Sequence, residues 1–231
     1  MKIVIALGGN ALLRKGERGT DVEQANAAME SIGHLKEVIE KNDTVITHGN
    51  GPQVGNLLLQ QHATKEVPEM PLHVLVAMTQ GQIGFFIEHA IARITKKKSM
   101  TIITHCEVDE NDSGFKNPTK PIGPFYKEKK PGMVEDAGRG YRLVVACPKV
   151  KRILEADTIK KLTGHGKVII AAGGGGIPIS AKGEGLQAVI DKDDASQVLA
   201  NEIKADVLLF VTAIDAVYSN FGKPNQKRIV K

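Results

Sequence analysis

The chain alternates between short runs of consecutive apolar residues and longer segments in which apolar residues recur at helical spacing. Five runs read as strands, at residues 3–7, 44–47, 100–104, 168–172 and 207–211. They are rich in Val, Ile and Leu and lack an apolar/polar alternation, which is typical of parallel strands covered on both faces. The pattern therefore predicts a buried, mainly parallel sheet.

Helices are predicted between these strands. In the first connection the apolar positions at helical spacing are Ala25, Met29, Ile32, Leu35 and Ile39. Thr20 or Asp21 precedes them as an N-cap. Further helices are predicted at roughly residues 53–63, 72–96, 151–162 and 194–204. Because strands and helices alternate, we expect an α/β fold with helices on the faces of the sheet.

Residues 109–148 interrupt this alternation with many prolines and glycines. The segment predicts a small inserted lid subdomain, with a little β structure around residues 141–146, that can close over the strand ends. The rest of the chain is long enough for one substantial core, so residues 1–231 are expected to form a single domain that carries this lid.

Composition excludes several classes of protein. No uninterrupted apolar run approaches the roughly 20 residues that cross a bilayer, so we expect a cytoplasmic protein without a membrane partner. Cys106 and Cys147 stand alone, without the spacing of a zinc site or of a disulfide framework, and no protein metal site is predicted.

The net charge of +5 could indicate a nucleic-acid-binding protein, but the basic excess lies within residues 116–152 and only 4% of residues are aromatic. A nucleic-acid-binding surface more often interleaves basic residues with exposed aromatics or presents a recognition helix. We therefore expect a lid that attracts small anions and no nucleic-acid partner.

Four glycine-rich or acidic turns follow predicted strands, at residues 8–11, 48–55, 173–178 and 190–195. Glycine lets backbone amides curl around phosphate oxygens, and a helix that starts there adds partial positive charge. Ligands of open parallel sheets bind at the carboxyl ends of the strands. The candidate phosphate-binding and substrate-binding residues are Gly8, Gly9, Asn10, Gly49, Asn50 and Gly51. His48 is expected to orient this turn rather than to act as a base.

Two lysines are candidates for phosphoryl-transfer chemistry. Lys120 is held between Pro118 and Pro121, and Lys192 lies between Asp191 and Asp193. Phosphoryl transfer requires cations that neutralise the transferred group, and carboxylates that hold those cations or a magnesium ion. The chain has neither the P-loop pattern nor a fitting dinucleotide-binding pattern, so those nucleotide-binding folds are disfavoured.

These motifs resemble those of the carbamate kinases, within the amino-acid kinase family. The resemblance runs from end to end and includes ALGGNA at 6–11, HGNGPQVG at 48–55, VEDAGRGYR at 134–142, GGGGIP at 173–178, VIDKDDAS at 189–196 and residues 212–226. The discriminating element is NPTKPIGPFY at 117–126. Related kinases share the glycines at the strand ends but not this lid segment.

The resemblance implies a three-layer α/β/α sandwich, a homodimer, and phosphoryl transfer between carbamoyl phosphate and ADP with Mg²⁺, as part of arginine metabolism. It implies that Lys120 and Lys192 contact the transferred group and that Asp193 organises the lysines. The implied nucleotide-binding residues are Gly174, Gly175, Asp215 and Tyr218. Many relatives have a catalytic lysine before the first glycine pair, where this chain has Ile5, Ala6 and Leu7.

The resemblance also implies that carbamate kinases continue past the position of Lys231, with another phosphate-contacting lysine and part of the adenine pocket. Two alternatives stay open at this point. The chain could be another amino-acid kinase that acts on a small carboxylate, or a binding protein for phosphorylated metabolites without catalytic activity.

Overall fold

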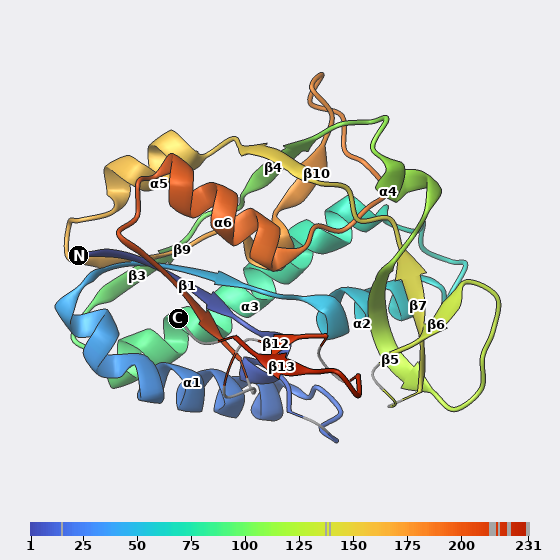
Figure 1. Ribbon diagram of the computed structural model, residues 1–231, viewed down its shortest axis with the longest axis horizontal. Helices are drawn as coiled ribbons and strands as arrows, with labels where there is room; N and C mark the ends of the chain where they lie inside the picture. The colour runs from blue at the N-terminus through green and yellow to red at the C-terminus, as the bar shows by residue number, and fades with distance from the viewer. Residues whose placement is uncertain are drawn as a thin grey trace.

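A five-stranded parallel sheet forms the middle layer of the molecule, with strand order β11-β1-β2-β9-β3 (Figure 1). Its strands are β1 (Lys2–Leu7), β2 (Asp43–His48), β3 (Lys98–Thr101), β9 (Lys167–Ile170) and β11 (Val207–Val211). The computed structural model describes all residues except 15, 137, 139, 213–215, 217, 221, 222, 230 and 231, and leaves out the side chain of Asn10. The predicted parallel sheet is confirmed.

Helices cover both faces of this sheet. α1 (Asp21–Lys41) and α3 (Leu72–Ile94) pack on one face, and α5 (Ala156–Leu162) and α6 (Lys192–Glu202) on the other. Successive side chains of β1 point to opposite faces of the sheet. Ile3 and Ile5 pack in the apolar cluster under α1 and α3, and Val4 packs in the cluster under α5 and α6. The result is the expected α/β/α sandwich.

Helix α1 begins where the sequence predicts. Thr20 is its N-cap and accepts a hydrogen bond from the amide of Glu23 at 3.3 Å, while the Glu23 carboxylate accepts one from the amide of Thr20 at 2.8 Å. This reciprocal capping box satisfies two amides that the first turn leaves free.

Helix α3 is, among the described residues, the one helix long and apolar enough to cross a membrane by length and composition. Half of its most apolar stretch is buried within the protein. Its Ile83, Ile87 and Ile91 pack against the sheet and α1, as in a core helix.

The segment 109–148 has the extra β structure that the sequence predicts. Its three-stranded antiparallel sheet has the order β5-β7-β6, from β5 (Lys120–Tyr126), β6 (Met133–Glu135) and β7 (Tyr141–Val145). A short helix, α4 (Ser113–Lys116), precedes β5. Figure 1 shows this sheet, hereafter the lid sheet, at one end of the molecule beside α2 (Gly51–Gln61).

The predicted helix at 151–162 is partly wrong, because Val150–Ile153 form strand β8 and the helix starts at Ala156. β8 pairs with β4 (His105–Val108), and β4 pairs with β10 (Ile177–Ile179) in a second small sheet. The remaining strands, β12 (Tyr218–Ser219) and β13 (Lys227–Arg228), form a hairpin.

Candidate active site

The turns after β1 and β2 meet at the carboxyl edge of the sheet. The amide of Gly49 donates to the carbonyl of Leu7 at 3.1 Å, and the amide of Gly8 donates to Val211 at 3.2 Å. A Cβ atom built on Gly49 would lie 3.5 Å from Cδ of Lys192 and 4.0 Å from the amide nitrogen of Gly9. The structure therefore brings both predicted glycine turns and Lys192 together at one point.

The side chain of Asn50 turns inward rather than toward this edge. It is buried, and its amide nitrogen donates to the hydroxyl of Thr79 on α3 at 2.9 Å. The Asn50 carboxamide, which the sequence predicted to bind a ligand, is therefore already hydrogen-bonded within the protein. Asn50 is the N-cap residue of α2, whose first residue is Gly51, but its side chain makes no capping hydrogen bond and is held by Thr79 instead.

His48 lies beneath the same turn and is fully buried. Its Nδ1 lies 3.0 Å from the carbonyl oxygen of Gly49, which can only accept, so Nδ1 carries the proton. Burial lowers the pKa of His48 to about 4. Its Nε2 has no hydrogen-bond partner among the described residues. This neutral, enclosed imidazole supports the predicted orienting role.

The turn at residues 190–195 forms the start of α6. The expectation that it directly follows a strand is wrong, because the preceding strand, β10, ends at Ile179. Asp191 is the N-cap, and its Oδ1 accepts the amide of Asp193 at 2.8 Å. Lys192 is the first residue of the helix rather than part of a preceding loop, and its ammonium pairs with the carboxylate of Asp193. The side chain of Lys192 is 18% exposed and that of Asp193 is 54% exposed. Lys192 thus lies against the Gly49 turn, with its ammonium 5.8 Å from the ring centre of Phe210.

Lys120 reaches the same turn from the lid sheet. It stands at the start of β5, and its ammonium pairs with Oδ2 of Asp191. Burial raises the pKa of Asp191, but the hydrogen bond and charge of Lys120 and the amides of the turn outweigh it, so this pKa lies below its ordinary value. The structure therefore links Lys120 to Asp191, and not to Asp193 as the sequence analysis expected.

A tight seam attaches the lid sheet to α2. A Cβ atom on Gly55 of α2 would lie 1.9 Å from Cα of Gly123 in β5, so the two backbones touch. Arg142 of β7 donates from Nε to the carbonyl of Gly123 at 2.9 Å and pairs with Asp136 at 3.0 Å. Its Nη2 lies 3.6 Å from the Cβ position of Gly51. Sequence reasoning missed this seam, because only the folded chain brings Gly55 and Gly123 together.

The turn at 173–176 lies under the site. Gly174 and Gly175 are buried, and Cβ atoms there would clash with Asn50 and Ile190 respectively. The thiol of Cys106 donates to the carbonyl of Gly175 at 2.7 Å, and burial raises its pKa. Contacts from these two glycines to a nucleotide stay a prediction, and their observed role is close packing.

Three predicted residues do not lie among these contacts. Asp215 and the side chain of Asn10 lie outside the described part of the chain. Tyr218 lies in the β12–β13 hairpin opposite Arg228.

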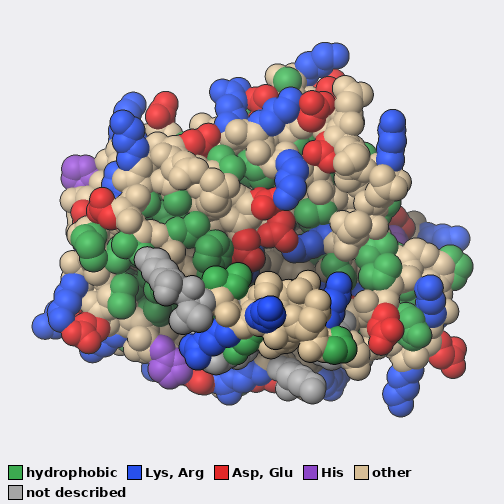
Figure 2. Space-filling view, viewed as in Figure 1, with side chains coloured by type: hydrophobic (Ala, Val, Ile, Leu, Met, Phe, Trp, Pro, Cys, Tyr) green, Lys and Arg blue, Asp and Glu red, His purple; other side chains and the backbone are tan. Residues whose placement is uncertain are grey.

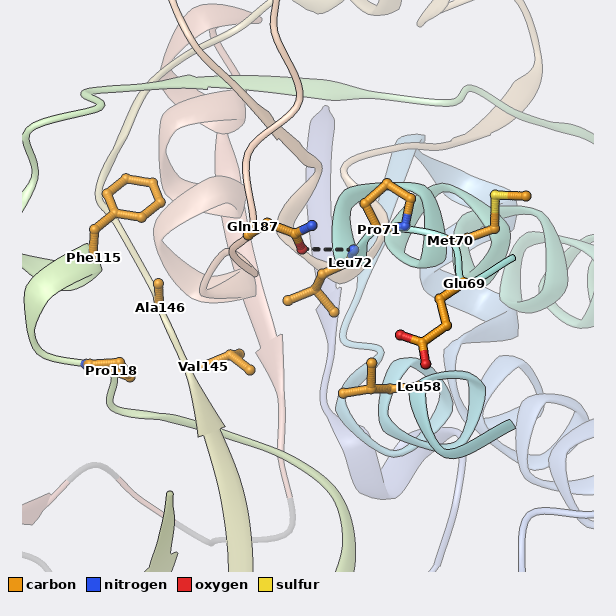
Figure 3. Close-up of a pocket in the computed structure, with 10 residues that line it drawn as sticks. All are labelled: Leu58, Glu69, Met70, Pro71, Leu72, Phe115, Pro118, Val145, Ala146 and Gln187. Atoms are coloured by element: carbon orange, nitrogen blue, oxygen red, sulfur yellow. Dashed lines mark hydrogen bonds between the residues drawn. The ribbon is translucent and has the colours of Figure 1, made fainter. Parts of the chain in front are cut away.

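The predicted site also occupies a distinct part of the surface. Acidic side chains gather at the middle of one face, over the start of α6, and basic side chains lie beside them around a hollow (Figure 2). A separate cavity of about 550 Å³ lies between the lid segment and α2 and α3 (Figure 3). Its lining includes Leu58, Leu72, Phe115 and Val145, and none of the predicted site residues. The predicted site at the strand-end edge and this cavity are therefore separate features of the surface.

Sequence comparisons match the whole chain to known proteins. The model of the amino acid kinase family matches residues 1–231. The carbamate kinase of Lentilactobacillus hilgardii is 48% identical over 249 residues, which cover 99% of this chain and 78% of that protein. The carbamate kinase of Thermococcus kodakarensis is 44% identical over 252 residues, which cover 100% of this chain and 80% of that protein.

Solved structures give the same result. The structure of Giardia carbamate kinase matches with a TM-score of 0.89 and 39% identity, over 99% of this chain and 78% of that one. The Giardia lamblia carbamate kinase bound to AMP-PNP matches with a TM-score of 0.84 and 38% identity, over 99% of this chain and 78% of that one. Isopentenyl phosphate kinase, at 14% identity and a TM-score of 0.56, shares the fold.

Proposed function

The chain belongs to the amino acid kinase family, and from this and its likeness to carbamate kinases over nearly its whole length we infer that it transfers a phosphoryl group between carbamoyl phosphate and ADP. The observation that carries this assignment is the meeting of the Gly8–Gly9 turn, the Gly49 turn and Lys192. Lys120 reaches the same place from β5 and pairs with Asp191, the residue before Lys192.

We propose that the glycine turns hold the carbamate and phosphoryl end of the substrate. Gly9 and Gly51 offer backbone amides without side chains in the way, and Gly51 opens helix α2. Gly8 and Gly49 shape the turns, because their amides donate to the carbonyls of Val211 and Leu7. Amides at a helix start favour anions. Asn10 and Asn50 complete the turns, Asn50 through its hydrogen bond to Thr79.

We propose that Lys120 and Lys192 neutralise the transferred phosphoryl group and that Asp193 holds Lys192. The carbamate oxygen and the ADP phosphate are already anionic, so neither direction of transfer needs a protein nucleophile or a general base. Positioning and charge then supply the rate enhancement.

We propose that the nucleotide brings Mg²⁺ into the site. No group of three or more His, Cys, Asp or Glu residues that could hold a metal occurs in the described part of the chain. Mg²⁺ often takes only one or two carboxylates from a protein and the rest of its ligands from phosphates and water. Asp193, half-exposed on the α6 turn, fits that limited role. The nucleotide contacts of Gly174, Gly175, Asp215 and Tyr218 stay predictions.

We further propose a cytoplasmic homodimer that serves arginine metabolism. The outer face of α3 supports the dimer. Met78 and Phe85 lie about two turns apart on this face and are 44% and 63% exposed, and Gly81 between them has open space at its Cβ position. Sedimentation of the wild type and of Phe85→Lys tests this face, since a charge there should yield monomers.

The decisive experiment compares phosphoryl donors. ATP formation from ADP and Mg²⁺ is measured with carbamoyl phosphate, acetyl phosphate and acetylglutamyl phosphate. We expect carbamoyl phosphate to give the highest kcat/KM. Preference for another donor would assign a different kinase of the family. Thermal stabilisation by carbamoyl phosphate without turnover would indicate a binding protein.

A further inference from the structure

The N-cap of α6 joins the core of the protein to the lid sheet through a single carboxylate. Oδ1 of Asp191 accepts the amide of Asp193 at 2.8 Å, which fixes the plane and direction of the carboxylate. Oδ2 then faces the ammonium of Lys120. The side chains of Asp191 and Lys120 are 33% and 35% exposed, so this pair is only partly open to water.

The two lysines of the site are matched with different acids of one turn. Lys192 pairs with Asp193 and Lys120 pairs with Asp191. Without these partners, two ammonium groups brought to one turn would repel each other, and the long side chain of Lys120 would sample many rotamers. Asp193 is already bonded to Lys192 and cannot by this geometry also place the lid lysine.

We propose that Asp191 is a positioning residue that holds Lys120 of the lid in place for phosphoryl transfer. The proposal rests on the proposed function, because it assigns to Lys120 a contact with the transferred group. Asp191 acts through Lys120 and needs no contact with substrate. The other oxygen of Asp191 accepts the capping hydrogen bond, which fixes the position of the carboxylate. Lys120 is therefore held in a defined position relative to α6 and to Lys192.

Asp191→Asn tests this idea, because asparagine caps a helix about as well as aspartate but carries no charge. We expect kcat to fall by between about 10-fold and 10²-fold, the range for a misplaced catalytic group. The KM for carbamoyl phosphate should change less. Asp194→Asn is the matched control, since it removes a charge from the same turn and, among the described residues, breaks an ion pair with Lys149, whose side chain is 78% exposed. Its kcat should equal that of the wild type.

A double-mutant cycle separates positioning from capping. If Asp191 acts through Lys120, then Asp191→Asn should cost nothing further in a Lys120→Ala background. Losses that multiply in the double variant would overturn the proposal, as would wild-type kcat in Asp191→Asn. Should Asp191→Asn fail to fold, Asp191→Ser, which also caps, replaces it in the cycle.

A readout without turnover keeps this inference distinct from the proposed function. The rate at which an amine-reactive reagent labels Lys120, followed by mass spectrometry, should rise several-fold in Asp191→Asn and stay unchanged in Asp194→Asn. Lys41, whose side chain is 71% exposed and pairs with Glu37, is the reference in both variants. An unchanged rate in both variants would mean that Asp191 does not hold Lys120. A wild-type protein without turnover would instead refute the proposed function, whatever the labelling shows.

Discussion

At the scale of single residues, the proposed phosphoryl transfer depends on two ammonium groups that we expect to contribute little to folding. Lys120 and Lys192 each pair with an acid at the edge of the sheet, and neither belongs to a cluster of buried apolar residues. Their value lies in the charge that they offer to a phosphoryl group, because electrostatic stabilisation is the main contribution of a protein to this reaction.

We predict that Lys192→Ala and Lys120→Ala each lower kcat by roughly 10² or more, as for the loss of one electrostatic stabiliser. Thermal unfolding should change little. Lys149→Ala, which removes an exposed lysine near the same turn, is the control and should leave kcat unchanged. Wild-type turnover in both site variants would exclude them as catalytic residues.

His48 should give the protein an acid-sensitive component of stability. Its folded pKa of about 4 lies below the unfolded value near 6.5, so the unfolded state binds more protons between these values. This contribution is complete above pH 6.5 and is lost as the pH falls toward 4, by up to about 3 kcal/mol.

Urea unfolding of wild type and His48→Asn across pH 4 to 7 measures that component. The variant should show a shallower pH dependence of the free energy of unfolding. His34→Asn, at an exposed position of α1, should keep the wild-type dependence. Parallel profiles for wild type and His48→Asn would show that the acid sensitivity arises elsewhere.

At the scale of elements, the contact between α2 and β5 sets where the lid sheet sits. Gly55 and Gly123 touch through their backbones, so Gly55→Ala cannot be accommodated without moving β5. We expect a loss of about 1–3 kcal/mol in stability, typical of overpacking, together with a lower kcat because Lys120 moves with β5.

Gly33→Ala provides the matched control for this substitution. Gly33 is an exposed glycine of α1 with nothing within 4 Å of its Cβ position. Alanine there should raise stability by about 0.5–1 kcal/mol because it favours the helix, without changing kcat. A Gly55→Ala protein as stable and active as the wild type would mean that the lid sheet does not depend on this seam.

At the scale of the whole molecule, the lid sheet contacts the core at the α2 seam, at the pair of Lys120 with Asp191, and through Ile122, which packs in an apolar cluster with residues of α2, α3 and β10. The rest of segment 109–148 includes many exposed residues. We predict that its amides exchange hydrogen faster than those of β1 and β2, and that ADP with carbamoyl phosphate slows them. Equal exchange with and without these ligands would indicate a rigid lid.

The sequence by itself determined the five parallel strands, the main helices and the residues at the strand ends. These features follow from local rules: apolar runs form buried strands, Thr20 caps α1, and glycine turns follow parallel strands. Strand β8 could not be predicted from these local rules. Its residues 150–153 have no local feature that excludes a helix, and their pairing with β4 decides the outcome.

Only the tertiary structure decided which groups meet at the site. The sequence places Lys192 equally close to Asp191 and Asp193, and only the fold brings Lys120 from 71 positions away onto Asp191. It also turns Asn50 toward Thr79 and sets Gly55 against Gly123. The physical reason is that a strand or turn is specified by neighbours along the chain, whereas charge pairing and backbone contact depend on packing between distant elements.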